Sequence, residues 1–538
     1  MAAVGTSEAE AAPVARSGGK GLKVGALGLL STLVIGVASV APAYSLAASL
    51  GFVTGSVGIF APSVMVLAFL PMLFIAAAYY YMNRADPDCG TTFTWVTRAM
   101  GPKSGWIGGW AILMTDLVVM PSLAAIAGKY TFDLFGAYGL AGSTFWVTLV
   151  GVIWIAVMTA ICYIGIELSA RTQQFLLGAE LVILVVFAVT ALAQVYGGHV
   201  AHSMHPSIGW LNPFRVVAGA NAPGWGALSA GMLTAVFIYW GWDTAVTVNE
   251  ESKDAKRTPG RAAVLSTLVL LGVYLVVSMA AQAYHGPGYL TKNSSDILGA
   301  LSGDVFGTGW GKLLVIAVLT SAAASTQTTI LPAARSSLSM AAHKAFPRRF
   351  ADIHPEHLTP GFSTLMFGVV SIVWYVVLTW LSPQEVLGNS ILALGFGIAF
   401  YYGITGYACV FYYRRHIFKS AKNFVFVGLA PLLGALILTL MFFIAAFYYS
   451  NPANGSVPGQ AWLPFVHFHF SVFGWDIYVR KGLGPPVVLG IGLLLLGVPL
   501  MVIWRVRHRD FFVRSRETAE SLEATAPPLT PGVVPVTD

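Results

Sequence analysis

Long runs of apolar residues, separated by short charged or Gly/Pro-rich connections, dominate the pattern of the chain. A helix needs about 20 mostly apolar residues to cross a bilayer, whereas a helix at the surface of a soluble domain repeats its apolar positions about every 3.6 residues. We therefore expect an all-α integral membrane protein with 12 transmembrane helices. The spans are predicted near residues 24–51, 58–82, 104–128, 142–163, 173–196, 226–249, 262–284, 310–333, 362–381, 391–412, 424–449 and 485–505.

The positions of the basic residues predict the orientation of these spans. An even number of spans places both ends of the chain on one side. Of the 30 Lys and Arg residues, 24 fall in the tails and connections on that side, and six fall on the other. Cytoplasmic loops are enriched in Lys and Arg, so residues 1–23 and 506–538 are predicted to be cytoplasmic tails. The net charge of +7 is then a signal of topology, and no nucleic-acid partner is expected.

The composition agrees with lipid surroundings and excludes several classes of function. Charged residues make up 10% of the chain, against about 25% in soluble domains. The three cysteines have no disulfide or metal-site spacing. The chain contains no HExxH, GxSxG or Walker-type motif, so neither an enzyme nor a cofactor nor a resident metal is expected. The charged residues within 250–256 are expected to form a solvated cluster in an inner connection.

The first predicted span contains an interruption near its middle. Pro42 lacks a backbone N–H and clashes with the preceding turn, and Gly36 and Ser39 lower helix propensity just before it. Irregular backbone at that depth is tolerated where it lines a cavity, although a Pro kink packed against neighbouring helices is the simpler alternative. The candidate substrate-binding residues of this span are Gly36, Ala38, Ser39, Val40, Ala41, Pro42 and Tyr44.

The sixth predicted span carries a second interruption, with Gly241 at its middle and the ionisable Asp243 two residues later. Spans 1 and 6 are five apart and therefore run in opposite directions. Corresponding breaks in two inverted halves are the best sequence sign of a transporter site at the membrane midplane. Phe237, Tyr239 and Trp240 are further candidates to gate the site or to stack on a cationic substrate, although they can instead face lipid or core.

Four stretches of the chain resemble amino-acid permeases of the amino acid–polyamine–organocation superfamily. They are the break of the first span and residues 88–110, 237–259 and 333–360. The resemblance covers roughly residues 23–420. It implies a LeuT-like 5+5 inverted repeat with discontinuous helices 1 and 6, and amino acids, amines or related small organic cations as substrates. The first repeat would span 24–196, the second 226–412, and two extra helices 424–505.

Two features depart from the family pattern. The break of the first span reads Ala-Ser-Val-Ala-Pro-Ala-Tyr, where many members show a Gly-Ser/Thr-Gly-Ile type of sequence. A nest for a substrate carboxylate is therefore less well supported here. The fifth span carries Glu180 where some proton-coupled relatives place a lysine. A mechanism in which that lysine replaces sodium should not be carried over.

Three acidic residues, Asp116, Glu180 and Asp243, fall deepest inside the predicted spans. An ionised carboxylate is costly there unless it is paired, protonated or functional. These residues are candidates for proton coupling or for attracting a substrate ammonium, and a hydrogen-bonded structural acid is the alternative. Ser321 and Ser325 in the eighth span are candidates to complete an ion site, although small polar residues also serve close helix packing.

These features predict a secondary active transporter for an amino acid or related amine, coupled to protons or working by exchange. The alternative is a channel or uniporter for a monovalent cation or another small solute on the same fold. The Ala/Gly-rich composition suggests a multi-pass protein of a bacterial plasma membrane. The bilayer, the substrate and H+ are the expected partners, and the protein is expected to be a monomer or homodimer.

Overall fold

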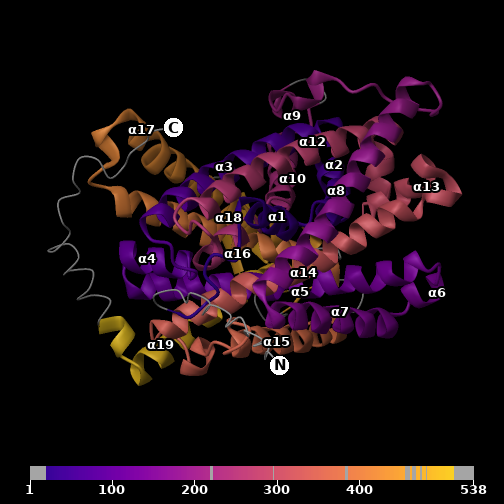
Figure 1. Ribbon diagram of the computed structural model, residues 1–538. Coiled ribbons are helices and arrows are strands. Elements are labelled where there is room, and N and C mark those ends of the chain that lie inside the picture. The colour runs from indigo at the N-terminus through magenta and orange to yellow at the C-terminus, as the bar shows by residue number, and fades with distance from the viewer. Residues whose placement is uncertain are drawn as a thin grey trace, which may run out of the picture.

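The computed structural model describes residues 20–218, 222–294, 296–381, 386–454, 461–462, 468–472, 475–479 and 482–513. The outer parts of the two predicted tails, residues 1–19 and 514–538, lie outside these ranges. Within the described residues, ten helices are long and apolar enough to cross a membrane. Figure 1 shows that the helices gather into one bundle.

The first five predicted spans all fall on helices. These are α1 (Leu29–Val40), α2 (Pro42–Val57), α3 (Ala61–Ala85), α5 (Pro102–Leu134), α7 (Thr144–Ile164) and α8 (Ile166–Tyr196). The connections contain the shorter helices α4 (Thr92–Met100), α6 (Tyr138–Ala141) and α9 (Phe214–Val217).

The later spans also fall on helices. These are α10 (Trp225–Phe237), α11 (Thr244–Thr247), α12 (Thr258–Lys292), α14 (Lys312–Ala342), α15 (Gly361–Leu381), α16 (Val386–Tyr413), α18 (Ala430–Ser450) and α19 (Pro485–Arg507). Helix α13 (Ile297–Trp310) lies in the connection before α14, and α17 (Ala421–Asn423) leads through a π-helical segment, Phe424–Leu429, into α18.

The number of long helices differs from the predicted twelve for two structural reasons. Helical segments follow one another almost without interruption from Leu29 to Ala85, so the first two predicted spans form one 57-residue stretch. The sixth predicted span is divided into α10 and α11, which are 13 and 4 residues long. The chain is thus a helical membrane protein, and its assignment to the twelve-helix inverted-repeat arrangement remains a prediction.

Burial separates the central helices from those at the rim. Helices α5 and α14 pack extensively against each other and are largely buried. Helix α8 instead buries Leu184 and Phe187 while it exposes Val182, Val185 and Val189. In a membrane protein an exposed apolar stripe faces acyl chains, which need no polar partner. The bundle therefore places its polar chemistry inside and its apolar surface towards lipid.

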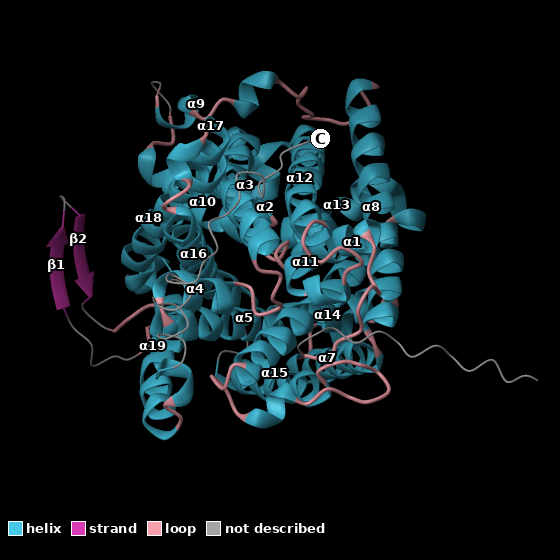
Figure 2. Ribbon diagram, turned by 60° about the vertical axis from the view of Figure 1, so that its left-hand side comes forward, coloured by secondary structure: helices cyan, strands magenta, loops and turns pink. Residues whose placement is uncertain are grey.

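The described residues also contain a short antiparallel hairpin, β1 (Phe468–Val472) and β2 (Trp475–Val479). It lies in the connection between α18 and α19, and Figure 2 shows it beside the helical bundle. The predicted all-α membrane fold describes the spans, and this hairpin in a connection adds an element that the prediction did not contain. The alternating polar and apolar side chains of the segment fit a strand of period two, which a search for long apolar runs does not detect.

Candidate functional site

The first break separates α1 from α2 at a single residue. Ala41 adopts the left-handed conformation, with φ 51° and ψ 68°, which a residue with a Cβ rarely takes. Pro42 then occupies the first turn of α2, where its missing N–H leaves no hydrogen bond unmade. The proline thus begins a new helix and does not bend a continuous one.

The second break separates α10 from α11 and lies against the first. Gly241 has φ 114°, a conformation accessible mainly to glycine. A Cβ at this position would lie 2.8 Å from the carbonyl oxygen of Ser39. The Ser39 and Thr244 hydroxyls are 2.8 Å apart, and a Cβ on Gly36 would lie 3.3 Å from the carbonyl oxygen of Trp242. The two interrupted segments therefore meet backbone to backbone.

Glu180 of α8 caps the start of α2. Its Oε1 atom accepts the backbone N–H of Ala43 at 2.6 Å. Ser321 of α14 accepts the N–H of Tyr44 at 3.1 Å and donates its own hydroxyl to Glu180 Oε1 at 2.8 Å. A negative charge is stabilised at a helix N-terminus by the exposed N–H groups and the helix dipole. Glu180 therefore forms part of the structure of the first break.

Further polar contacts complete the first break. The Ser325 hydroxyl donates to the carbonyl oxygen of Ser39 at 3.0 Å. The carbonyl oxygens of Ala38 and Val40 accept the N–H of Ala41 and the hydroxyl of Ser45. The structure thus brings both predicted serines, Ser321 and Ser325, to the break.

Asp243 is buried beside the second break and is held by two tyrosines of α16. Its Oδ1 accepts the hydroxyl of Tyr402 at 2.7 Å, and its Oδ2 accepts that of Tyr401 at 3.1 Å. The indole Nε1 of Trp240 lies 2.5 Å from the Tyr401 oxygen. Tyr401 and Tyr402 are not among the site residues predicted from the sequence. Their only sequence signal is an adjacent tyrosine pair inside an apolar span.

Asp116 of α5 is the third buried acid. Its Oδ2 atom has no hydrogen-bond partner among the described residues. The neighbouring Thr115 packs against Gly397 of α16, the helix that carries Tyr401 and Tyr402. Asp116 therefore lies on a helix that packs against the Asp243 side of the breaks, while Glu180 belongs to the α2 side.

The predicted aromatic residues lie in the core of the bundle. Phe237 packs edge-on against Tyr44, with ring centroids 6.3 Å apart. Tyr239 packs against Tyr274 at 5.1 Å, and Trp240 is buried as well. None of the three faces lipid, and the Phe237–Tyr44 contact joins the two interrupted helices.

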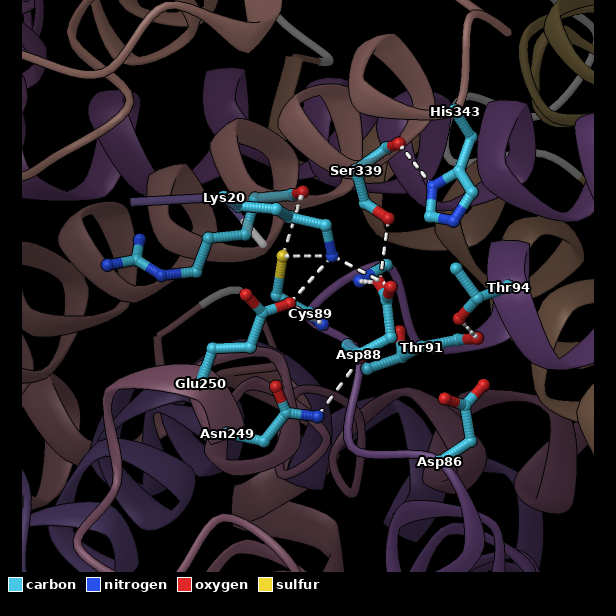
Figure 3. A network of polar contacts seen from close by, with 12 residues as sticks. Lys20, Asp86, Asp88, Cys89, Thr91, Thr94, Asn249, Glu250, Ser339 and His343 are labelled. Atoms are coloured by element: carbon cyan, nitrogen blue, oxygen red, sulfur yellow. Dashed lines mark hydrogen bonds and ion pairs between the residues drawn. The ribbon is translucent and has the colours of Figure 1, made fainter. Parts of the chain in front are cut away.

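A second polar cluster lies where the segment after α11 meets the α3–α4 connection (Figure 3). The Lys20 ammonium is 2.7 Å from Asp88 Oδ2, 2.6 Å from Glu250 Oε1 and 3.5 Å from the Cys89 sulfur. Ligand atoms of the other three residues lie within 4.8 Å of one another. A metal ion could bridge such a spacing, but the ammonium already lies among these atoms.

Charge and backbone pairing both tighten this cluster. Burial is the largest single effect and disfavours the ionised form of Asp88, but Lys20, His343 and the Gly90 N–H together outweigh it and hold the pKa of the carboxyl below its usual range. Next to it, the backbone of Leu27 pairs with the segment after α11 through the Glu251 carbonyl at 3.0 Å and the Lys253 N–H at 2.8 Å. The residues before α1 are therefore joined to the residues after α11.

The prediction of a solvated charge cluster within 250–256 is wrong for Glu251. Its carboxylate is fully buried and receives two hydrogen bonds from Arg335 of α14, at 2.6 and 2.8 Å. The sequence shows Glu251 beside other charged residues, whereas its partner is 84 positions away. Only the three-dimensional structure reveals the pairing.

Comparisons with known proteins agree with this architecture. A family described as amino acid permease matches residues 27–467. An uncharacterized transporter of Mycobacterium tuberculosis is 28% identical over 70% of this chain and 78% of its own. The low-affinity putrescine importer PlaP of Escherichia coli is 22% identical over 81% of this chain and 90% of its own length. A putative arginine/ornithine antiporter of Escherichia coli is 24% identical over 58% and 66%.

Proposed function

Because the chain belongs to the amino acid permease family, we propose that it is a secondary active transporter that moves an amino acid or related amine across a bacterial plasma membrane. The observation that carries this proposal is the pair of abutting helix breaks with buried Glu180 and Asp243 beside them. Irregular backbone and buried acids deep in a membrane protein mark substrate or ion pathways. The similarity to a low-affinity putrescine importer and to a putative arginine/ornithine antiporter of Escherichia coli supports the same class of activity.

We assign Asp243 to the ammonium group of the substrate. Its two oxygens accept hydrogen bonds from the hydroxyls of Tyr401 and Tyr402. An ammonium group carries three donors and can replace both hydroxyls while it adds an opposite charge. The tyrosines keep the carboxylate satisfied when the site is empty, so that an incoming cation exchanges one set of hydrogen bonds for a stronger one.

We propose that α1 and α11 move together when the site changes its exposure. Ser39 and Thr244 link them through their hydroxyls, and Leu27 joins the segments that flank them. Helix α2 is held to α8 and α14 through Glu180 and Ser321, and α1 and α11 also contact α14 through Ser325 and Thr328. The left-handed Ala41 and the positive φ of Gly241 then mark the points where the backbone can turn.

The coupling that we propose uses a proton at Glu180. The carboxylate accepts two hydrogen bonds at Oε1, from Ala43 and Ser321, while Oε2 has no partner among the described residues. Protonation removes the charge that stabilises the start of α2. This change would loosen α2 from α8 and so link proton binding to the position of the break.

Uptake by purified protein in liposomes tests the proposal. A labelled amino acid or diamine should accumulate saturably, and Asp243→Asn should reduce uptake at least about tenfold, which corresponds to a loss of about 1.4 kcal/mol. Asp510→Asn is the matched control because the Asp510 carboxylate is exposed and pairs only with an exposed lysine. Uptake that does not change when the pH is stepped would refute the proposed proton coupling. Large single-channel currents without counterflow would favour the channel alternative.

A further inference from the structure

The backbone N–H groups at the start of α2 already have partners within the protein. The N–H of Ala41 donates a hydrogen bond to the Ala38 carbonyl oxygen at 3.1 Å, and Pro42 has no N–H group. Those of Ala43 and Tyr44 bond to Glu180 and Ser321. The N–H groups of a helix N-terminus form the usual binding site for an anion. At this break an internal carboxylate and a hydroxyl fill that site.

Charge adds a second argument against a substrate carboxylate here. Glu180 is fully buried, and its Oε2 atom has no hydrogen-bond partner among the described residues. While Glu180 is ionised, a second carboxylate at the same helix N-terminus would face a like charge at close range, where repulsion in a low dielectric is strong. The unpartnered oxygen can instead accept a donor from a ligand.

The opposite side of the breaks is acidic as well. Asp243 and Asp116 are buried there, and Asp116 also has one oxygen without a partner among the described residues. Among the described residues, no Lys, Arg or His side chain takes part in the hydrogen bonds around the two breaks. Arg335, the buried arginine of α14, is engaged by Glu251. In the part of the chain that the structure describes, the site therefore offers acceptors and acidic groups and no cationic side chain to bind a carboxylate.

From these observations we infer that the preferred substrate is an organic amine without a carboxylate, and not a zwitterionic amino acid. This inference rests on the proposed transport function. Glu180 occupies the place of a substrate carboxylate, and the ammonium group binds at the acidic side chains. A compound with an ammonium group and no carboxylate satisfies the acceptors and adds no anion to the filled helix N-terminus.

Matched pairs of compounds test the inference on the wild-type protein. Putrescine and ornithine, cadaverine and lysine, and agmatine and arginine differ only by a carboxylate. In competition against uptake of labelled putrescine in liposomes, or by thermal stabilisation of the purified protein, each amine should be effective at a concentration at least tenfold lower than its amino acid. Lysine amide, which has the size of lysine and no carboxylate, should behave like cadaverine and thereby exclude an effect of size.

Glu180→Gln tests the role of the internal carboxylate. The amide keeps an oxygen for the Ala43 N–H and removes the charge, so the ratio between the members of a pair should shift towards the amino acid by several-fold. Glu167→Gln is the matched control, because it removes a half-exposed carboxylate from the first turn of the same helix α8, and it should keep the wild-type order. If Glu180→Gln does not fold, the wild-type ratios decide alone.

The outcomes separate this inference from the proposed function. Amino acids that compete better than their amines would overturn the inference and leave the transporter intact. If no compound of either series binds or is transported, both fail.

Discussion

The ion pair between Glu251 and Arg335 gives the most quantitative prediction. The two side chains are 0% and 2% exposed, and two hydrogen bonds of 2.6 and 2.8 Å join them in a fork. Each ion has left water at a cost of several kcal/mol, which only its partner offsets. Glu251→Gln leaves the guanidinium buried without a counter-charge. We expect this change to lower the free energy of unfolding by about 3–5 kcal/mol.

A double-mutant cycle separates the loss of the pair from general damage. The cycle consists of Glu251→Leu, Arg335→Met and the variant with both changes. Each single change leaves a buried charge unpaired, whereas the double variant removes both desolvation costs and should be close to neutral. The matched control is the pair between Lys344 and Asp510, 3.2 Å apart and 58% and 67% exposed. Breaking it with Asp510→Asn should cost less than about 1 kcal/mol because solvent screens exposed charges.

The assay is reversible unfolding in mixed micelles, followed by tryptophan fluorescence as the denaturing detergent is increased. The free energy is extrapolated to zero denaturant for the wild type, the single variants and the double variant. A cost below about 1 kcal/mol for Glu251→Gln would refute the argument. A double variant whose loss equals the sum of the two single losses would also refute it, because independent sites add.

Three further predictions concern the hinge, the lysine cluster and a buried acid. Gly241→Ala forces a Cβ against the Ser39 carbonyl and should cost about 1–3 kcal/mol of stability with loss of uptake. Gly272→Ala in α12, where a Cβ meets open space, is the control and should be neutral or slightly stabilising. Equal effects of the two substitutions would contradict the role of Gly241 as a hinge. Cys89 is 0% exposed, and Lys20→Met should raise its labelling by maleimide several-fold, as measured by peptide mapping with mass spectrometry. Unchanged labelling would show that Lys20 does not cover the thiol. Burial raises the pKa of Asp86 from 3.8 to about 6 although Arg98 opposes the shift, so this carboxyl supports folding below about pH 4 and loses that contribution as pH rises through 6. Asp86→Asn should therefore gain up to about 3 kcal/mol relative to wild type between pH 4 and 7 in thermal or detergent unfolding, and a constant difference across that range would contradict the shift.

The helices could be predicted from the sequence because lipid imposes a simple rule on them. A spanning segment must be apolar and must satisfy its backbone internally, so each predicted run falls on a helix. The positions of the two breaks were also visible, since Pro42 and Gly241 change the backbone in ways that do not depend on distant residues.

The contacts of the site could not be predicted, because they join residues far apart in the chain. Asp243 meets Tyr402 across 159 positions, and Glu180 meets Ala43 across 137. The sequence identifies Asp243 and Glu180 as buried acids but does not show which donors they receive. The identity of these hydrogen-bond donors distinguishes an acid that binds substrate from one that caps a helix.

The lengths of the helices imply that changes in bilayer thickness act unequally on the bundle. Buried α5 has 33 residues and rim helix α7 has 21, which at about 1.5 Å per residue gives about 50 and 32 Å. The hydrocarbon core is about 30 Å thick, so α7 matches it while α5 extends beyond it at ordinary tilts. A thicker or thinner membrane would therefore strain rim helices such as α7 and α15, which pack against each other. The buried helices α5 and α14 would be insulated from hydrophobic mismatch.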